Sequence, residues 1–149
     1  MEQLKNTSEG MVVSKLQNGI VIDHIKQGQG YKIFKQLGLD TLDEVVVLMR
    51  NVPSRKMGKK DLIKIETDME VNLDVLGLID PSATVTYVKD GHSERKVRLS
   101  LPKRVRGILA CKNPRCITNQ ERIPNVLFTL VDEDSKEYAC EYCEARTRL

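Results

Sequence analysis

The 149-residue chain is poor in aromatic side chains and in histidine. Aromatic residues make up 4% of the sequence, and its two histidines are His24 and His92. Nucleic-acid binders often stack bases on aromatic rings, so this chain offers few such platforms. Histidine is the residue type best suited to acid–base catalysis near neutral pH, the chain has only these two, and no nucleophile–base pair is evident. An enzyme is therefore a weaker interpretation than a binding or regulatory protein.

Long apolar runs are also missing. No segment reaches the roughly 18 consecutive apolar residues that a membrane span requires. The opening residues, MEQLKNTSEG, are polar and mixed in charge, and they lack the apolar core of a secretory signal. We therefore expect a cytoplasmic protein that does not associate with membranes. The net charge of +3 is too small to indicate nucleic-acid binding from composition alone.

Cysteine is absent until residue 111 and then occurs in two close pairs. CKNPRC carries Cys111 and Cys116, and CEYC carries Cys140 and Cys143. Two tight turns that present four thiolates suit tetrahedral Zn²⁺, and a site filled by four protein ligands activates no water. We therefore predict one structural Zn²⁺ per chain. Two disulfides, unpaired core cysteines and an iron–sulfur cluster are the alternatives.

The first hundred residues predict an α+β domain. Apolar patterning and turn residues indicate strands over 19–25, 44–49, 57–66, 84–88 and 94–101. Helices are expected over 30–38 and from a capping box formed by Thr67 and Glu70 to Ile79, with Val71 on its apolar face. Residues 50–59 are expected to form a loop. This order is the ferredoxin-like split βαβ arrangement, an antiparallel sheet with two helices on one face and one extra strand.

Pro102 marks the expected boundary between two domains. We expect a flexible segment over residues 1–10, a nucleotide-binding domain over 11–101 and a zinc-binding domain over 102–149. The last of these is too short to bury a self-sufficient core without a metal or disulfides. Residues 126–139 read as a hairpin between the two cysteine pairs, which predicts a small all-β, zinc-ribbon-like domain.

Positive charge gathers around one loop and strand. The alternation of a β-strand places Lys60 and Lys64 on one face of MGKKDLIKIE, and Asp61, Ile63 and Ile65 on the other. The cations of this region are Arg50, Arg55, Lys56, Lys59, Lys60 and Lys64. They are either a solvated face or a site for an anion.

Two other strands carry groups that suit a nucleotide. Asp23 and His24 lie in VIDHI, and Lys96 lies in ERKVRLSLP. A carboxylate accepts hydrogen bonds from ribose hydroxyls, while lysine and histidine bind phosphates. Each residue also has an ordinary structural interpretation, so the residues alone leave both possibilities open.

Six motifs in order resemble those of one known family. VIDHI, MGKKDLIKIE, PSATV, SLP, CKNPRC and CEYC, spread over residues 19–143, resemble the regulatory chain of aspartate carbamoyltransferase. The resemblance implies a non-catalytic subunit of the enzyme that commits carbamoyl phosphate and aspartate to pyrimidine biosynthesis. It implies an allosteric domain that binds CTP, UTP or ATP, and a zinc domain that docks on the catalytic chain. It also implies that regulatory chains dimerise through their N-terminal domains.

The resemblance also implies roles for individual residues. Asp23 would hold the ribose, His24 and Lys64 would meet phosphates, Lys96 would be the second major phosphate contact, and Lys60 would support them. In the segment VVSKLQN, Lys15 and Leu16 are candidate base contacts.

A zinc-ribbon nucleic-acid-binding protein is the alternative function. The tail has nine Lys and Arg against seven Asp and Glu over residues 102–149, and a zinc site with four thiolates adds a charge of −2. The loaded tail is therefore nearly neutral, which disfavours this alternative.

Overall fold

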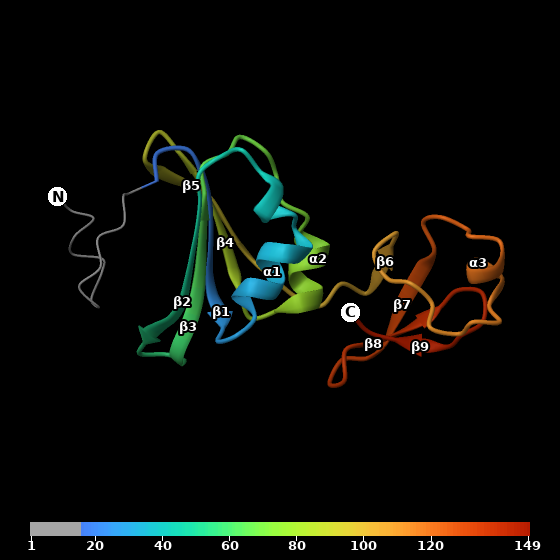
Figure 1. Cartoon of the computed structure of the whole chain (residues 1–149). Coiled ribbons are helices and arrows are strands. Elements are labelled where there is room, and N and C mark those ends of the chain that lie inside the picture. The colour runs from blue at the N-terminus through green and yellow to red at the C-terminus, as the bar shows by residue number, and fades with distance from the viewer. Residues whose placement is uncertain (1–15) are drawn as a thin grey trace. The chain divides into compact units, whose positions relative to one another are not determined.

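The computed structural model describes residues 16–149 of the chain (Figure 1). The chain divides into two compact units, residues 1–99 and residues 100–149. The flexible segment expected over residues 1–10 and the candidate base contact Lys15 lie outside the described residues. Leu16, the other candidate base contact, is described and is buried.

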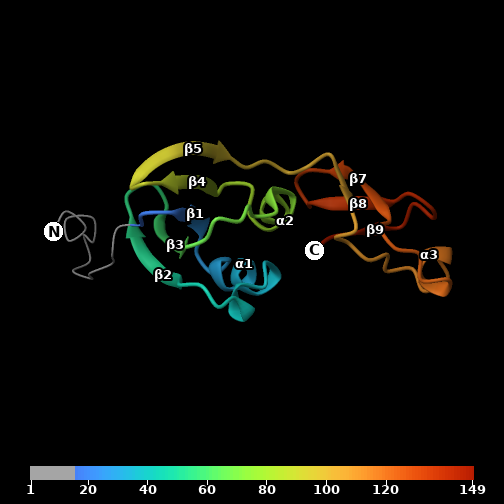
Figure 2. The ribbon, with the colours of Figure 1, turned by 90° about the horizontal axis from the view of Figure 1, so that it is seen from above.

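The first unit is an antiparallel sheet with two helices, as the sequence predicts. The strand order is β2-β3-β1-β4-β5, and every neighbouring pair is antiparallel. Figures 1 and 2 show α1 and α2 on the same face of this sheet. The split βαβ prediction is confirmed, with β5 as the extra strand. The elements are β1 (Gly19–Lys26), α1 (Gly30–Gln36), the 3₁₀ helix η2 (Leu39–Thr41), β2 (Val46–Ser54), β3 (Gly58–Ile65), α2 (Leu73–Ile79), β4 (Thr84–Lys89) and β5 (His92–Arg98).

Strand alternation separates the two faces of this sheet. Ile20, Ile22, Ile63, Ile65 and Val85 are at most 1% exposed, and they form the core beneath the helices. Burial of each such side chain contributes about 1.5–3 kcal/mol to folding. The intervening residues of the same strands therefore point to the opposite face, which we call the open face.

The start of α2 differs from the prediction. The side chain of Asn72 caps the helix, because its Oδ1 accepts hydrogen bonds from the N–H groups of Asp74 and Val75 at 3.0 and 3.2 Å. Thr67 instead accepts from the N–H of Met69 in a local turn. The predicted capping box at Thr67 is therefore wrong, and Val71 precedes the helix. Asn is among the strongest N-cap residues and outcompetes the earlier motif.

The predicted loop over residues 50–59 is mostly strand. β2 continues to Ser54 and β3 starts at Gly58, so the turn is much shorter than expected. β2 lies at the edge of the sheet, and edge strands tolerate a proline such as Pro53, which has no backbone N–H to donate. The first helix also ends earlier, at Gln36, because Gly38 adopts a left-handed conformation with φ 68° and starts η2.

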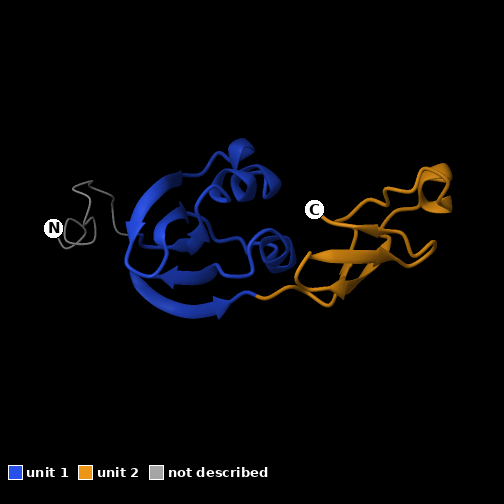
Figure 3. Cartoon of the chain, turned by 90° about the horizontal axis from the view of Figure 1, so that it is seen from below, with its two compact units in different colours: residues 1–99 blue, residues 100–149 orange. Residues whose placement is uncertain are grey.

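The second unit, orange in Figure 3, contains a four-stranded sheet of order β6-β7-β8-β9. Its elements are β6 (Arg104–Arg106), the one-turn helix α3 (Ile117–Gln120), β7 (Leu127–Asp132), β8 (Glu137–Cys140) and β9 (Arg146–Thr147). The β7–β8 pair is the predicted hairpin, whereas α3 was not predicted. Phe128 and Tyr138 are fully buried and form much of a small core. Among the described residues, no helix has the length and apolar character needed to cross a membrane.

Candidate metal centre and anion-binding face

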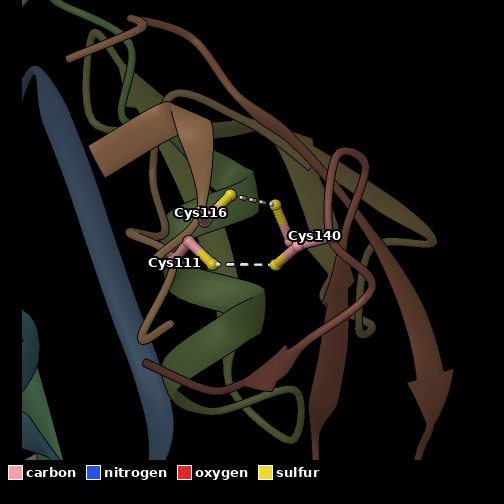
Figure 4. Close-up of side chains that lie close together, drawn as sticks. Cys111, Cys116 and Cys140 are labelled. Atoms are coloured by element: carbon pink, nitrogen blue, oxygen red, sulfur yellow. Dashed lines mark hydrogen bonds between the residues drawn. The ribbon is translucent and has the colours of Figure 1, made fainter. Parts of the chain in front are cut away.

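Four sulfur atoms meet at one point in the second unit. The Sγ atoms of Cys111, Cys116, Cys140 and Cys143 all lie within 4.8 Å of one another. The Cys111–Cys143 pair is separated by 3.5 Å. The Cys116–Cys140 pair is separated by 3.8 Å (Figure 4). A tetrahedral site with Zn–S bonds of about 2.3 Å has sulfur–sulfur edges of about 3.8 Å. The four thiols therefore fit one metal ion, and their separations exceed the roughly 2.0 Å of a disulfide.

Local hydrogen bonds shape the turn that carries the first pair of cysteines. The side-chain amide of Asn119 donates to the carbonyls of Cys111 and Asn113 at 2.9 and 2.7 Å. The N–H of Cys116 donates to the carbonyl of Asn113 at 3.0 Å. These bonds close the CKNPRC turn from the α3 side. The second turn begins where β8 ends at Cys140, whose carbonyl accepts the N–H of Glu144 at 2.9 Å.

Two donors point at the sulfur atoms themselves. The Thr118 hydroxyl donates to Cys116 Sγ at 3.1 Å, and the Tyr142 N–H donates to Cys140 Sγ at 3.4 Å. The Thr118 hydrogen bond lowers the pKa of Cys116 to about 7, whereas burial raises the pKa of Cys111 to about 12. Metal binding must therefore displace protons from these thiols. Such donors to sulfur typically accompany thiolate metal ligands and tune them.

We expect Thr118→Val to weaken zinc binding by about 10- to 100-fold, since the hydroxyl that stabilises the Cys116 thiolate is lost. Competition with a chromophoric chelator measures this affinity. Thr129→Val, at an exposed position of β7, is the matched control and should leave it unchanged. Equal affinity of the two variants would contradict a role for the hydroxyl.

A row of residues crosses the open face of the first unit. Lys64 pairs with Val21, Val21 with Thr86, and Thr86 with Lys96, across β3, β1, β4 and β5. Directly paired residues of antiparallel strands share a face. Lys64 and Lys96 therefore lie on one face, three strand spacings or about 14 Å apart.

The other candidate residues gather beside this row. Lys60 Nζ lies 2.8 Å from Asp23 Oδ1, and the same oxygen accepts the N–H of His24 at 2.6 Å. The His24 Nδ1 atom lies 3.2 Å from Thr84 Oγ1, within hydrogen-bonding distance. Asp23 and His24 occupy a bulge of β1, where His24 has a φ of 58°. The bulge directs both side chains to the same side of the strand.

Arg98 is a cation of this face that the sequence reasoning missed. It pairs with Thr84, which in turn pairs with Asp23, so it shares their face. Its position two residues after Lys96 could have revealed it, because strand side chains repeat every two residues. Arg55 and Lys56 belong instead to the turn between β2 and β3.

The fold and the two sites define a two-unit chain with a cationic face on one unit and a cysteine metal centre on the other. Comparison with known proteins gives the family. The model of the aspartate carbamoyltransferase regulatory chain, allosteric domain, matches residues 11–100, and that of the metal binding domain of the same chain matches residues 103–148. The chain belongs to the aspartate carbamoyltransferase regulatory chain family.

Individual relatives carry the same name. The aspartate carbamoyltransferase regulatory chain of Clostridium botulinum (strain Hall) is 50% identical over 135 residues, which cover 90% of this chain and 92% of the relative. That of Clostridium tetani is 46% identical over 136 residues, covering 90% and 94%. That of Bifidobacterium longum is 39% identical over 139 residues, covering 93% and 100%.

Family membership confirms several predictions. The resemblance to regulatory chains is confirmed, and with it the interpretation as a non-catalytic subunit. The metal binding domain of the family, together with the four-cysteine cluster, confirms the expected metal cofactor and is consistent with one zinc per chain.

Proposed function

We propose that this chain binds the nucleoside triphosphates CTP, UTP and ATP on the open face of its first unit, and transmits their effect to the catalytic chain of aspartate carbamoyltransferase. The observation that carries the proposal is the cross-strand row with Lys64 and Lys96 at its ends, beside the Lys60–Asp23 pair. Four groups that suit phosphates and one that suits a ribose share this face.

Each residue of the face receives a chemical role. Asp23 accepts hydrogen bonds from the ribose hydroxyls, and His24, Lys64 and Lys96 contact the phosphates. Lys60 supports the phosphates once it leaves Asp23. Ionised donors to phosphate form short, strong hydrogen bonds, which is why charged side chains dominate such sites. Arg98 adds a further cation to the same face.

The Lys60–Asp23 ion pair links recognition of the ribose to recognition of the phosphates. Both side chains are partly buried, with 19% and 28% of their surface exposed. A ligand whose phosphates draw Lys60 away from Asp23 frees an acceptor of that carboxylate for the ribose hydroxyls. A ligand that has a ribose but no phosphates, or phosphates but no ribose, cannot satisfy both Asp23 and Lys60.

We expect Asp23→Ala to weaken ATP binding by about tenfold, because the acceptor for the ribose hydroxyls is lost. Binding of inorganic tripolyphosphate should stay equal or become tighter, since Lys60 is then unpaired. Isothermal titration calorimetry of the zinc-loaded chain with both ligands measures this. A parallel loss of affinity for ATP and tripolyphosphate would contradict the ribose role.

For the second unit, we propose that Cys111, Cys116, Cys140 and Cys143 hold one Zn²⁺. The ion has a structural role there because four protein ligands leave it no open position. The zinc-loaded unit docks on the catalytic chain, and first units pair to form regulatory dimers. Residues 11–101 thus serve as the allosteric domain and 102–149 as the zinc-binding domain. Four reduced thiols suit a cytoplasmic location.

Regulation requires that an effector bind two global states of the assembly unequally. A coupling free energy of about 1–3 kcal/mol changes affinity by about 5- to 150-fold. Co-purification with the catalytic chain, followed by aspartate saturation curves with and without CTP and ATP, tests the whole proposal. Curves that neither nucleotide shifts would contradict it.

A further inference from the structure

We propose that Asp61 is a positioning residue of the nucleotide site, an inference that rests on the proposed function. Its side chain lies on the helix-covered face of β3 and is 0% exposed. The carboxylate accepts three backbone N–H groups. Oδ2 accepts from Gly28 at 3.0 Å and from Gly30 at 2.9 Å, and Oδ1 accepts from Asn51 at 3.0 Å.

These three donors lie on the two sides of β3. Gly28 and Gly30 follow β1, and Asn51 lies in β2. β3 runs between β1 and β2, so a single carboxylate on it connects Asn51 of β2 with the segment that follows β1. Buried donors of this kind need a partner, because an unpaired buried N–H is costly.

Both neighbours of β3 are bulged where Asp61 lies. On β1, the two residues Asp23 and His24 stand opposite the single residue Leu62. On β2, Arg50 and Asn51 stand opposite Asp61 itself. A bulge leaves an extra residue outside the regular ladder, and the Asp61 carboxylate accepts the N–H of Asn51 at that point.

The bulges determine where the site residues point. The β1 bulge brings Asp23 and His24 to the open face, and Lys60, the residue before Asp61, meets Asp23 at 2.8 Å. On the far side of the strand, Asp61 holds Asn51 of the β2 bulge and the turn that follows β1 through its three hydrogen bonds. Asp61 therefore acts on the nucleotide through Lys60, its neighbour in β3, without touching the ligand.

Two substitutions disturb the Asp61 carboxylate in different ways. Asp61→Asn replaces one acceptor oxygen by an NH₂ group, which then faces a backbone N–H. Gly30→Ala leaves Asp61 in place but adds a Cβ that would lie 2.7 Å from Asp61 Cβ and 2.8 Å from its Oδ2. Either change disturbs the three hydrogen bonds that the side chain at position 61 accepts.

A double-mutant cycle separates positioning from general support of the fold. The ATP dissociation constant is measured by calorimetry for the zinc-loaded wild type, Asp61→Asn, Lys60→Gln and the double variant. We expect Asp61→Asn to weaken ATP binding by about tenfold in the wild type and by less than about threefold with Lys60→Gln. If Asp61→Asn weakens ATP binding equally with Lys60 and with Gln at position 60, or does not weaken it at all, the role of Asp61 is overturned.

Control variants keep the test decisive. Leu76→Val removes a methylene-sized volume from a fully buried side chain of α2 and should lower stability without changing ATP affinity. If Asp61→Asn does not fold by circular dichroism, Gly30→Ala takes its place in the same cycle, with the same expected result.

A wild-type chain that gives no heat with ATP would contradict the proposed function itself. Wild-type binding with additive effects would overturn this inference alone.

Discussion

Removal of zinc is expected to release this chain from the catalytic chain while nucleoside triphosphate binding survives. The second unit has a small core around Phe128 and Tyr138, and its four thiols converge on one point. Structural zinc contributes roughly 10–16 kcal/mol to the folding of such domains near pH 7. Few domains have more than about 15 kcal/mol of stability in total. Without the metal, the docking unit should therefore unfold.

A mercurial titration measures this result on the assembled enzyme. Zinc release is followed with a metal-sensitive dye, dissociation by sedimentation velocity, and ATP binding by calorimetry on the released chain. Excess thiol with added Zn²⁺ should restore the assembly, which is the control for irreversible damage. An assembly that stays intact after full zinc release would contradict the proposal, as would loss of ATP binding in step with the metal.

Lys64→Ala is expected to weaken CTP and ATP binding by about 10- to 100-fold, the effect of losing a charged hydrogen-bond donor to phosphate. Lys64 is half-buried on β3 and lies in the same cross-strand row as Lys96. The response of aspartate saturation to both nucleotides should shrink accordingly. Turnover by the catalytic chain without effectors should not change.

The matched control is Lys59→Ala. Lys59 lies on the same strand and carries the same charge, but strand alternation places it on the opposite face from Lys64. If the effect arises from a specific phosphate contact, this control binds ATP almost as well as the wild type. If both variants weaken ATP equally, general electrostatic attraction explains the binding and the assignment of Lys64 is wrong.

Short-range patterns in the sequence were enough to predict the architecture. The order of strands and helices indicated the split βαβ sheet, and the two cysteine pairs indicated a metal site. Alternation placed Ile63 and Ile65 in the core with Asp61, while Lys60 and Lys64 took the other face. These features depend on residues close together in the chain, so local periodicity reveals them.

Helix and strand ends were harder to predict, because several local signals compete there. The Thr67 motif is a valid capping pattern, yet Asn72 caps the helix that forms. β2 extends past Asn51 because a bulge and an edge position accommodate residues that usually form loops. The competing signals differ little in free energy, so the packing of the whole sheet decides which of them prevails.

The sequence by itself determined which residue types lie on each strand face and that four cysteines occur as two pairs. Only the tertiary structure decided that Asp23 meets Lys60, and that Asp61 connects Asn51 of β2 with the turn after β1. The physical reason is strand register. Register depends on hydrogen bonds between segments far apart in the chain, and one inserted residue in a bulge redirects every side chain beside it.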